Sequence, residues 1–82
     1  GENVPEMLDA DLGSEKNNQS CLKEAIVVCE SARDFLSRDV LENILDDTEE
    51  HIDWIETQQN LIEGTGIQNY LQEQMFDSGE SE

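Results

Sequence analysis

Large apolar residues in the first half of the chain follow the pattern of an amphipathic helix. Together with smaller apolar residues they lie on one helical face, which consists of Met7, Leu12, Leu22, Ala25, Ile26, Cys29, Ala32 and Phe35. Pro5 suits the first helical position, where its missing N–H is not needed. The pattern predicts a helix over about residues 5–36.

A polar stretch interrupts this apolar face. Residues 13–20 include no large apolar side chain, and their local propensity favours a loop between two shorter helices. The helical phase nevertheless continues across the stretch. At about 100° per residue, Glu15 lies within about 20° of both Leu22 and Ile26. If the helix is continuous, Glu15 therefore points along the apolar face.

A second apolar face predicts a helix over about residues 38–62, with Ser37 as its N-cap. Its members are Val40, Leu41, Ile44, Leu45, Ile52, Ile55, Leu61 and Ile62. Thr48 and His51 fall on the same face, whereas acidic residues occupy the opposite one. This helix therefore also carries an ionisable side chain among its apolar residues.

A third, short helix is predicted over about residues 66–76, after two glycines that end the second one. Its apolar face consists of Ile67, Tyr70, Leu71 and Met75. The acidic tail at residues 77–82 lacks apolar side chains, and we expect it to be disordered. Two long helices joined by a tight turn at Ser37 form an αα-hairpin, so residues 1–76 are predicted to fold as one all-α unit.

The charge of the chain excludes some classes of partner. Acidic residues outnumber basic ones 21 to 4, which gives a formal charge of −17 over 82 residues. Nucleic-acid binding through phosphate contacts needs a basic surface, and anionic membranes repel an acidic chain, so we expect neither partner. No apolar run is long enough to cross a membrane, and no signal peptide is visible.

The two cysteines, Cys21 and Cys29, give no sign of a disulfide or of a zinc site. Eight residues of helix separate them by about 12 Å, which is too far for a disulfide. The sequence has neither a CxxC motif nor a Cys/His cluster, so zinc is not expected. Reduced thiols favour a cytoplasmic location.

Glu15 and His51 are the candidate metal ligands. In di-iron four-helix bundles, one helix supplies a Glu and its neighbour a Glu-x-x-His motif, because residues three apart on a helix can reach one metal. Here Thr48 stands three residues before His51, so the motif lacks its carboxylate. The alternative is that Glu15 is solvated and that His51 is a neutral core histidine.

The sequence resembles a known family, the bacterioferritins. The turn between that family's third and fourth helices is similar in sequence to residues 29–39, CESARDFLSRD. The family also has a stretch similar to residues 49–58, EEHIDWIETQ. GIQNYLQ at residues 66–72 is similar to its short fifth helix, and residues 1–8 resemble the start of its third helix. The resemblance implies the C-terminal half of a ferritin-like four-helix bundle, with helix continuing through residues 13–20.

The resemblance also implies which metal ligands this chain carries and which it lacks. The third-helix Glu falls on Glu15, the fourth-helix His on His51, and the bridging Glu on Thr48. The first two helices, with their ligands and the haem-binding Met, are missing from the sequence, and neither Met7 nor Met75 matches the haem position. The implied iron centre is therefore an incomplete di-iron site, and haem would be possible only in an intact assembly.

The function implied is that of an iron-storage subunit or fragment, which contributes to ferrous iron binding, oxidation and mineral storage in a multi-subunit cage of ferritin-like subunits. The loss of the bridging carboxylate at Thr48 leaves the ferroxidase activity of this chain open. The missing half would come from a chain that supplies the first two bundle helices, or from a second copy. The alternative is a catalytically inactive subunit that packs as a helical partner in a larger assembly.

Overall fold

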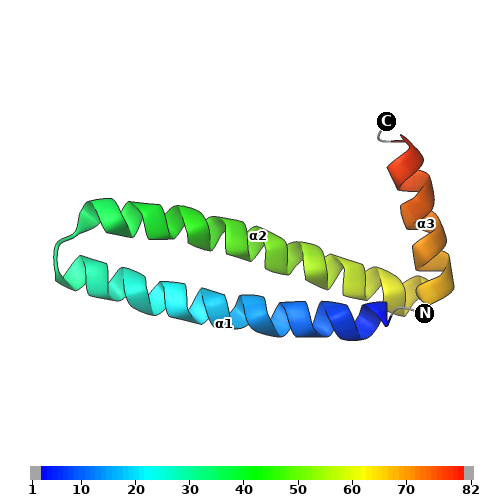
Figure 1. The fold of residues 1–82 in the computed structure, drawn as a ribbon, viewed down its shortest axis with the longest axis horizontal. Helices are drawn as coiled ribbons and strands as arrows, with labels where there is room; N and C mark the ends of the chain where they lie inside the picture. The colour runs from blue at the N-terminus through cyan, green and yellow to red at the C-terminus, as the bar shows by residue number, and fades with distance from the viewer. Residues whose placement is uncertain (1–2, 81–82) are drawn as a thin grey trace.

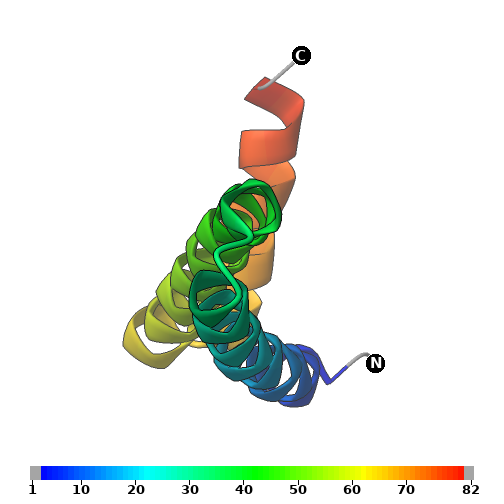
Figure 2. The same cartoon turned by 90° about the vertical axis from the view of Figure 1, so that its left-hand side faces the viewer.

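The computed structural model describes the backbone of residues 3–80 and the side chains of residues 3–74. It contains three helices, α1 (Val4–Ser31), α2 (Phe35–Thr65) and α3 (Ile67–Glu80), and no strand within residues 3–80. α1 and α2 lie side by side and antiparallel, and α3 leaves the end of α2 at a steep angle (Figures 1 and 2). The prediction of an all-α hairpin with a short third helix is confirmed.

α1 continues without a break through the polar residues 13–20. Asn3 caps its first turn, where the side-chain oxygen accepts from the Glu6 N–H at 3.1 Å. The continuous helix that the family resemblance implies is therefore confirmed, and the loop favoured by local propensity does not form. Packing of the apolar face against α2 outweighs the weak propensity of the polar stretch.

The turn between the two long helices begins earlier than the sequence pattern predicts. α1 ends at Ser31 rather than near residue 36, because Arg33 takes a left-handed conformation with φ 59°. The Arg33 N–H donates to the Glu30 carbonyl at 3.1 Å, and the Asp34 N–H donates to the Cys29 carbonyl at 2.8 Å. This is the Schellman motif, in which glycine usually takes the left-handed position.

The N-cap of α2 is Asp34, and the prediction of Ser37 at this position is wrong. The Asp34 carboxylate accepts from the Ser37 N–H at 3.1 Å. That hydrogen bond holds the pKa of Asp34 below its usual value. α2 therefore begins at Phe35, three residues before the predicted start, and Ser37 lies inside its first turn.

The far end of the chain is more helical than predicted. α2 extends to Thr65, where the threonine hydroxyl donates to the Leu61 carbonyl at 2.7 Å, and Gly66 then turns the chain with φ 85°. α3 runs on through residues 77–80, where the sequence predicts a disordered tail. Adding residues to an existing helix is easier than starting one, because each adds a hydrogen bond without a new nucleus. Residues 81–82 lie outside the described residues.

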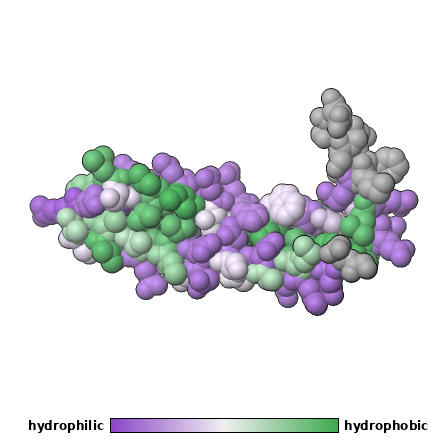
Figure 3. Space-filling view, in the orientation of Figure 1, coloured by the Kyte–Doolittle hydropathy of each residue, from purple (hydrophilic) through white to green (hydrophobic). Residues whose placement is uncertain are grey.

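Apolar burial is uneven along the hairpin. Among the residues whose side chains the structure describes, five apolar ones are buried: Leu8, Ile26, Ile52, Ile55 and Tyr70. Ile52 lies near the middle of α2, and Leu8, Ile55 and Tyr70 lie towards the open end of the hairpin. There α3 meets α2, and the Tyr70 hydroxyl donates to the Gln58 side-chain oxygen at 2.7 Å. Ile26 alone is buried near the turn, and Figure 3 shows exposed apolar residues gathered over that end. None of the helices within residues 3–80 has the length and apolar character needed to cross a membrane.

Candidate metal site

Glu15 and His51 meet at the middle of the hairpin. Glu15 lies halfway along α1 and His51 halfway along α2, and the Oε2 atom of Glu15 is 2.7 Å from Nδ1 of His51. The Glu15 side chain is mostly covered, with 19% of its surface exposed, whereas that of His51 is 49% exposed. The two candidate ligands are thus in contact, and His51 is not an enclosed core residue.

Hydrogen bonds to both oxygens of Glu15 favour its ionised form. Asn18 donates from Nδ2 to Oε1 at 3.0 Å, while His51 takes Oε2. The contact with His51, followed by that with Asn18, lowers the pKa of Glu15. An ionised carboxylate can only accept, so the hydrogen between the pair belongs to His51 Nδ1.

The indole ring of Trp54 lies beside the imidazole ring of His51. Trp54 follows His51 by three residues on α2, and the two ring centroids are 6.2 Å apart with a tilt of 31°. About half of Trp54 remains exposed. Trp54 lies about 60–100° from the centre of the apolar face, a position that predicts an interface or half-buried residue. One side of the histidine is thus covered by an aromatic ring.

Thr48 is buried one turn before His51. It lines a groove of about 390 Å³ between α1 and α2, together with Asn18, Cys21, Leu22, Ala25 and Ile44. The position that would need a bridging carboxylate therefore holds a hydroxyl within a largely apolar surface. A hydroxyl is a weaker ligand than a carboxylate for hard cations such as ferrous and ferric iron.

Neighbouring carboxylates do not compensate for Thr48. Glu49 accepts a hydrogen bond from the Gln19 Nε2 atom at 3.1 Å, and Glu56 forms an ion pair with Lys16 at 3.6 Å. Within the residues that the structure describes, no group of three or more His, Cys, Asp or Glu side chains is placed to hold a metal ion. The candidate donors that the structure brings together are therefore two, Glu15 and His51.

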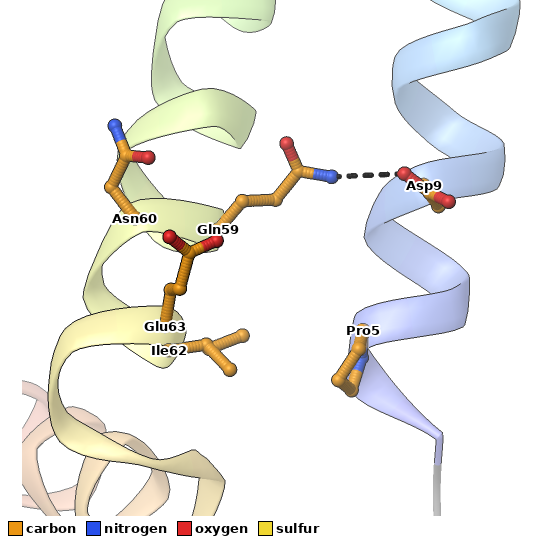
Figure 4. A pocket seen from close by; sticks show the side chains of 6 residues that line it. All are labelled: Pro5, Asp9, Gln59, Asn60, Ile62 and Glu63. Carbon is orange, nitrogen blue, oxygen red and sulfur yellow. Dashed lines mark hydrogen bonds between the residues drawn. The ribbon is translucent and has the colours of Figure 1, made fainter.

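A second groove lies at the open end of the hairpin, away from this pair. It measures about 490 Å³ and is lined by Pro5, Asp9, Gln59, Asn60, Ile62 and Glu63 (Figure 4). The Gln59 amide donates to the Asp9 carboxylate across it at 3.2 Å. Asp9 thus already has a partner, and the groove contains no histidine or cysteine, so it does not add to the metal ligands.

The sequence pattern predicted the two candidate ligands, which the structure places in contact, but it did not predict the residues around them. The helical phase indicated that Glu15 and His51 point towards the same region, and the structure brings them into contact. Asn18 and Gln19 were missed because both lie in the polar stretch whose propensity favours a loop. Once the helix is continuous, the three-residue spacing of Glu15 and Asn18 is the signal that could have identified their contact.

Comparisons with known proteins place this geometry in context. Residues 1–65 match the family described as ferritin-like domain. The chain is 55% identical over 76 residues to a bacterial ferritin of Synechocystis sp. and 49% identical over 76 residues to one of Pseudomonas aeruginosa; each match covers 92% of this chain and 49% of the relative. A bacterioferritin of Brucella melitensis is 38% identical over 72 residues, which cover 88% of this chain and 45% of that protein. The chain thus spans about half the length of the curated relatives it matches.

Proposed function

The chain belongs to the ferritin-like family, and on this premise we propose that it forms part of an iron-storage subunit of the bacterioferritin type. In this proposal the chain corresponds to the C-terminal half of the subunit and contributes an incomplete iron site. The contact between Glu15 and His51 across α1 and α2 carries the proposal. It joins a carboxylate and an imidazole, which are donor types that suit iron.

The role of the chain at this site is to bind and orient a ferrous ion. A cation could take the place of the hydrogen between Glu15 Oε2 and His51 Nδ1. The imidazole would then stay neutral by carrying its proton on Nε2, exchanged through the solvent that reaches His51. Asn18 stays on the other oxygen of Glu15 and keeps the carboxylate directed at the site. Bound iron supplies the redox chemistry, and oxidation to a stored mineral would take place in a cage of ferritin-like subunits.

The groove lined by Leu22, Ala25, Ile44 and Thr48 supports the proposed partner. A hairpin with an apolar groove along one side leaves that side uncovered, and two further helices would bury it. We propose that a chain supplying the first two bundle helices occupies this groove and brings the remaining ligands. Haem binding would belong to that partner. A cytoplasmic location remains a prediction from the reduced cysteines.

Anaerobic ferrous titration of the 82-residue chain tests the metal claim. We expect binding that is weak and is lost in Glu15→Gln and in His51→Ala. Asp9→Asn is the control, because Asp9 is another carboxylate of α1 that contacts a side chain of α2, there the amide of Gln59. Equal binding by the wild type and both site variants would refute a role for this pair.

A second candidate function is favoured by the buried hydroxyl of Thr48. In this alternative, a subunit without the bridging carboxylate has a purely structural role and packs as a helical partner in a mixed assembly. The Thr48→Glu variant, mixed with a chain that supplies the first two bundle helices, distinguishes a role in iron oxidation from a purely structural role. A gain in the rate of iron oxidation on exposure to oxygen supports a site weakened by this one residue, and no gain supports the structural role.

A further inference from the structure

We infer that Asn18 is a specificity-determining residue of the candidate metal site, because it leaves Glu15 only one oxygen with which to bind a cation. This inference rests on the proposed function, since it concerns the way in which the Glu15–His51 pair would bind its ion. It adds that the site selects cations that accept an imidazole over cations that depend on both oxygens of a carboxylate. Calcium represents the second class in the test below.

The two oxygens of Glu15 face different partners. Oε2 lies 2.7 Å from Nδ1 of His51 on α2, whereas Oε1 accepts a hydrogen bond from Nδ2 of Asn18 at 3.0 Å. A cation bound between Glu15 and His51 takes its position at Oε2, because the imidazole lies on that side. Oε1 is then still held by the amide of Asn18, and the carboxylate binds the ion through one oxygen.

Asn18 can hold Oε1 because of its place on α1. It follows Glu15 by three residues, and side chains with this spacing are neighbours on a helix surface. Its NH₂ group can only donate and the ionised carboxylate can only accept, so the two groups match. The Glu15 side chain is 19% exposed, which leaves little solvent to compete for its oxygens.

The number of oxygens that Glu15 offers affects which ion is bound. Ca²⁺ takes 6–8 oxygen ligands and can gain two of them from one carboxylate. Imidazole suits iron and zinc, which bind well to mixed nitrogen and oxygen donors. With Oε1 engaged by Asn18, the pair offers one oxygen and one nitrogen. This is a poor set for calcium and a suitable beginning of a site for ferrous iron or zinc.

Asn18 also lines the groove assigned to the missing half of the bundle. A helix that fills this groove would cover the amide and shield its hydrogen bond to Glu15 from water. Hydrogen bonds are electrostatically stronger where water is excluded. The restriction on Glu15 should therefore become stronger when the bundle is complete.

Infrared difference spectra of the whole chain with Zn²⁺, which stands in for ferrous iron without being oxidised, test this inference. A carboxylate bound through one oxygen has its antisymmetric and symmetric stretching bands further apart than a carboxylate bound through both. We expect the wide separation in the wild type and the narrow one in Asn18→Ala, where Oε1 is released. Glu15→Gln should remove these bands and thereby assign them.

Calorimetric titration with Zn²⁺ and with Ca²⁺ measures the selectivity. Only binding that Glu15→Gln abolishes is counted, because a chain of charge −17 also attracts cations elsewhere. The ratio of the Ca²⁺ dissociation constant to the Zn²⁺ dissociation constant should fall by about tenfold or more in Asn18→Ala. This is the size of effect that partners of metal ligands commonly have.

Gln19→Ala is the matched control. It removes a hydrogen bond of the same kind, which the Gln19 amide donates to the carboxylate of Glu49 at 3.1 Å, and it should change neither the band separation nor the ratio. Alanine is the best helix former, so circular dichroism should show no loss of helix in either variant.

The possible failures of the inference and of the proposed function can be distinguished. A wide band separation that persists in Asn18→Ala overturns the inference and leaves the proposed function standing. Equal changes in Asn18→Ala and Gln19→Ala do the same, because the effect is then not specific to the Glu15 contact. Absence of any binding that depends on Glu15 overturns the proposed function, and this inference with it.

Discussion

The two ends of the hairpin are built from similar helical sequence but differ in what covers their apolar residues. In the half of the hairpin towards the open end, where α3 meets α2, Leu8, Ile52, Ile55 and Tyr70 are buried. Towards the turn, Ile26 is the one buried apolar residue among those described, and the apolar side chains exposed there are Val27, Val28, Phe35, Leu36 and Val40. An apolar helical face therefore predicts where burial is needed but not whether the same chain supplies it.

The largest expected effect comes from Ile55, the one large side chain with 0% exposure among the described residues. Ile55→Ala should lower the free energy of unfolding by about 2–5 kcal/mol, because it removes buried contacts and leaves a cavity. Val28→Ala at the turn end is the matched control and should change it by less than about 0.5 kcal/mol. Thermal or urea unfolding followed by circular dichroism measures both, and equal losses would show that the two ends do not differ.

Tyr70 tests how much α3 contributes to the covered end. Tyr70→Phe removes the donor to the buried Gln58 oxygen and should lower the free energy of unfolding by about 1–3 kcal/mol. The double variant with Gln58→Leu removes both polar partners and should recover much of that loss, because no polar atom is then buried without a partner. The same unfolding measurements serve, and an unaffected Tyr70→Phe would mean that α3 does not stabilise the open end.

The stability of the hairpin near its turn depends on Asp34, the N-cap of α2. Asp34→Ala should lower the free energy of unfolding by about 1 kcal/mol at neutral pH. Because folding lowers the pKa of Asp34, this stabilisation is present above the pKa of the unfolded side chain, near 3.9, and is lost as the pH falls through the lower folded value. The difference between wild type and variant should therefore shrink below about pH 4; a constant difference down to pH 2 would contradict a role for the ionised cap.

Substitution of Arg33 should have the smallest effect on the free energy of unfolding, and it should raise that free energy where the other variants lower it. Arg33→Gly should raise the free energy of unfolding by up to about 1 kcal/mol, because glycine takes the left-handed conformation without the clash of a β-carbon. Arg33→Ala, which keeps the clash and loses the charge, is the control. A stabilisation that is equal in both variants would assign the effect to charge and not to the backbone.

Much of the fold followed from the sequence, and the failures have identifiable physical causes. The family resemblance, in agreement with the helical phase, predicted that α1 continues through residues 13–20, and the structure places Glu15 against His51. The turn was misplaced because an arginine, and not a glycine, takes the left-handed position, and because Asp34 caps α2 before Ser37 can. The contacts of Asn18 and Gln19 depend on which side chains face each other across two helices, and a single helical pattern does not contain that information.

The uneven burial along the hairpin has a consequence for its motion. Segments that bury few side chains open at a lower free energy than the molecule as a whole, and their amide hydrogens exchange with solvent sooner. The first part of α2 and the last part of α1 should therefore exchange early, while the amides around Ile52 and Ile55 are retained longest. Local unfolding of the hairpin should therefore begin at the turn between α1 and α2 and proceed towards the middle. The Glu15–His51 pair lies at the middle, where this local unfolding should end.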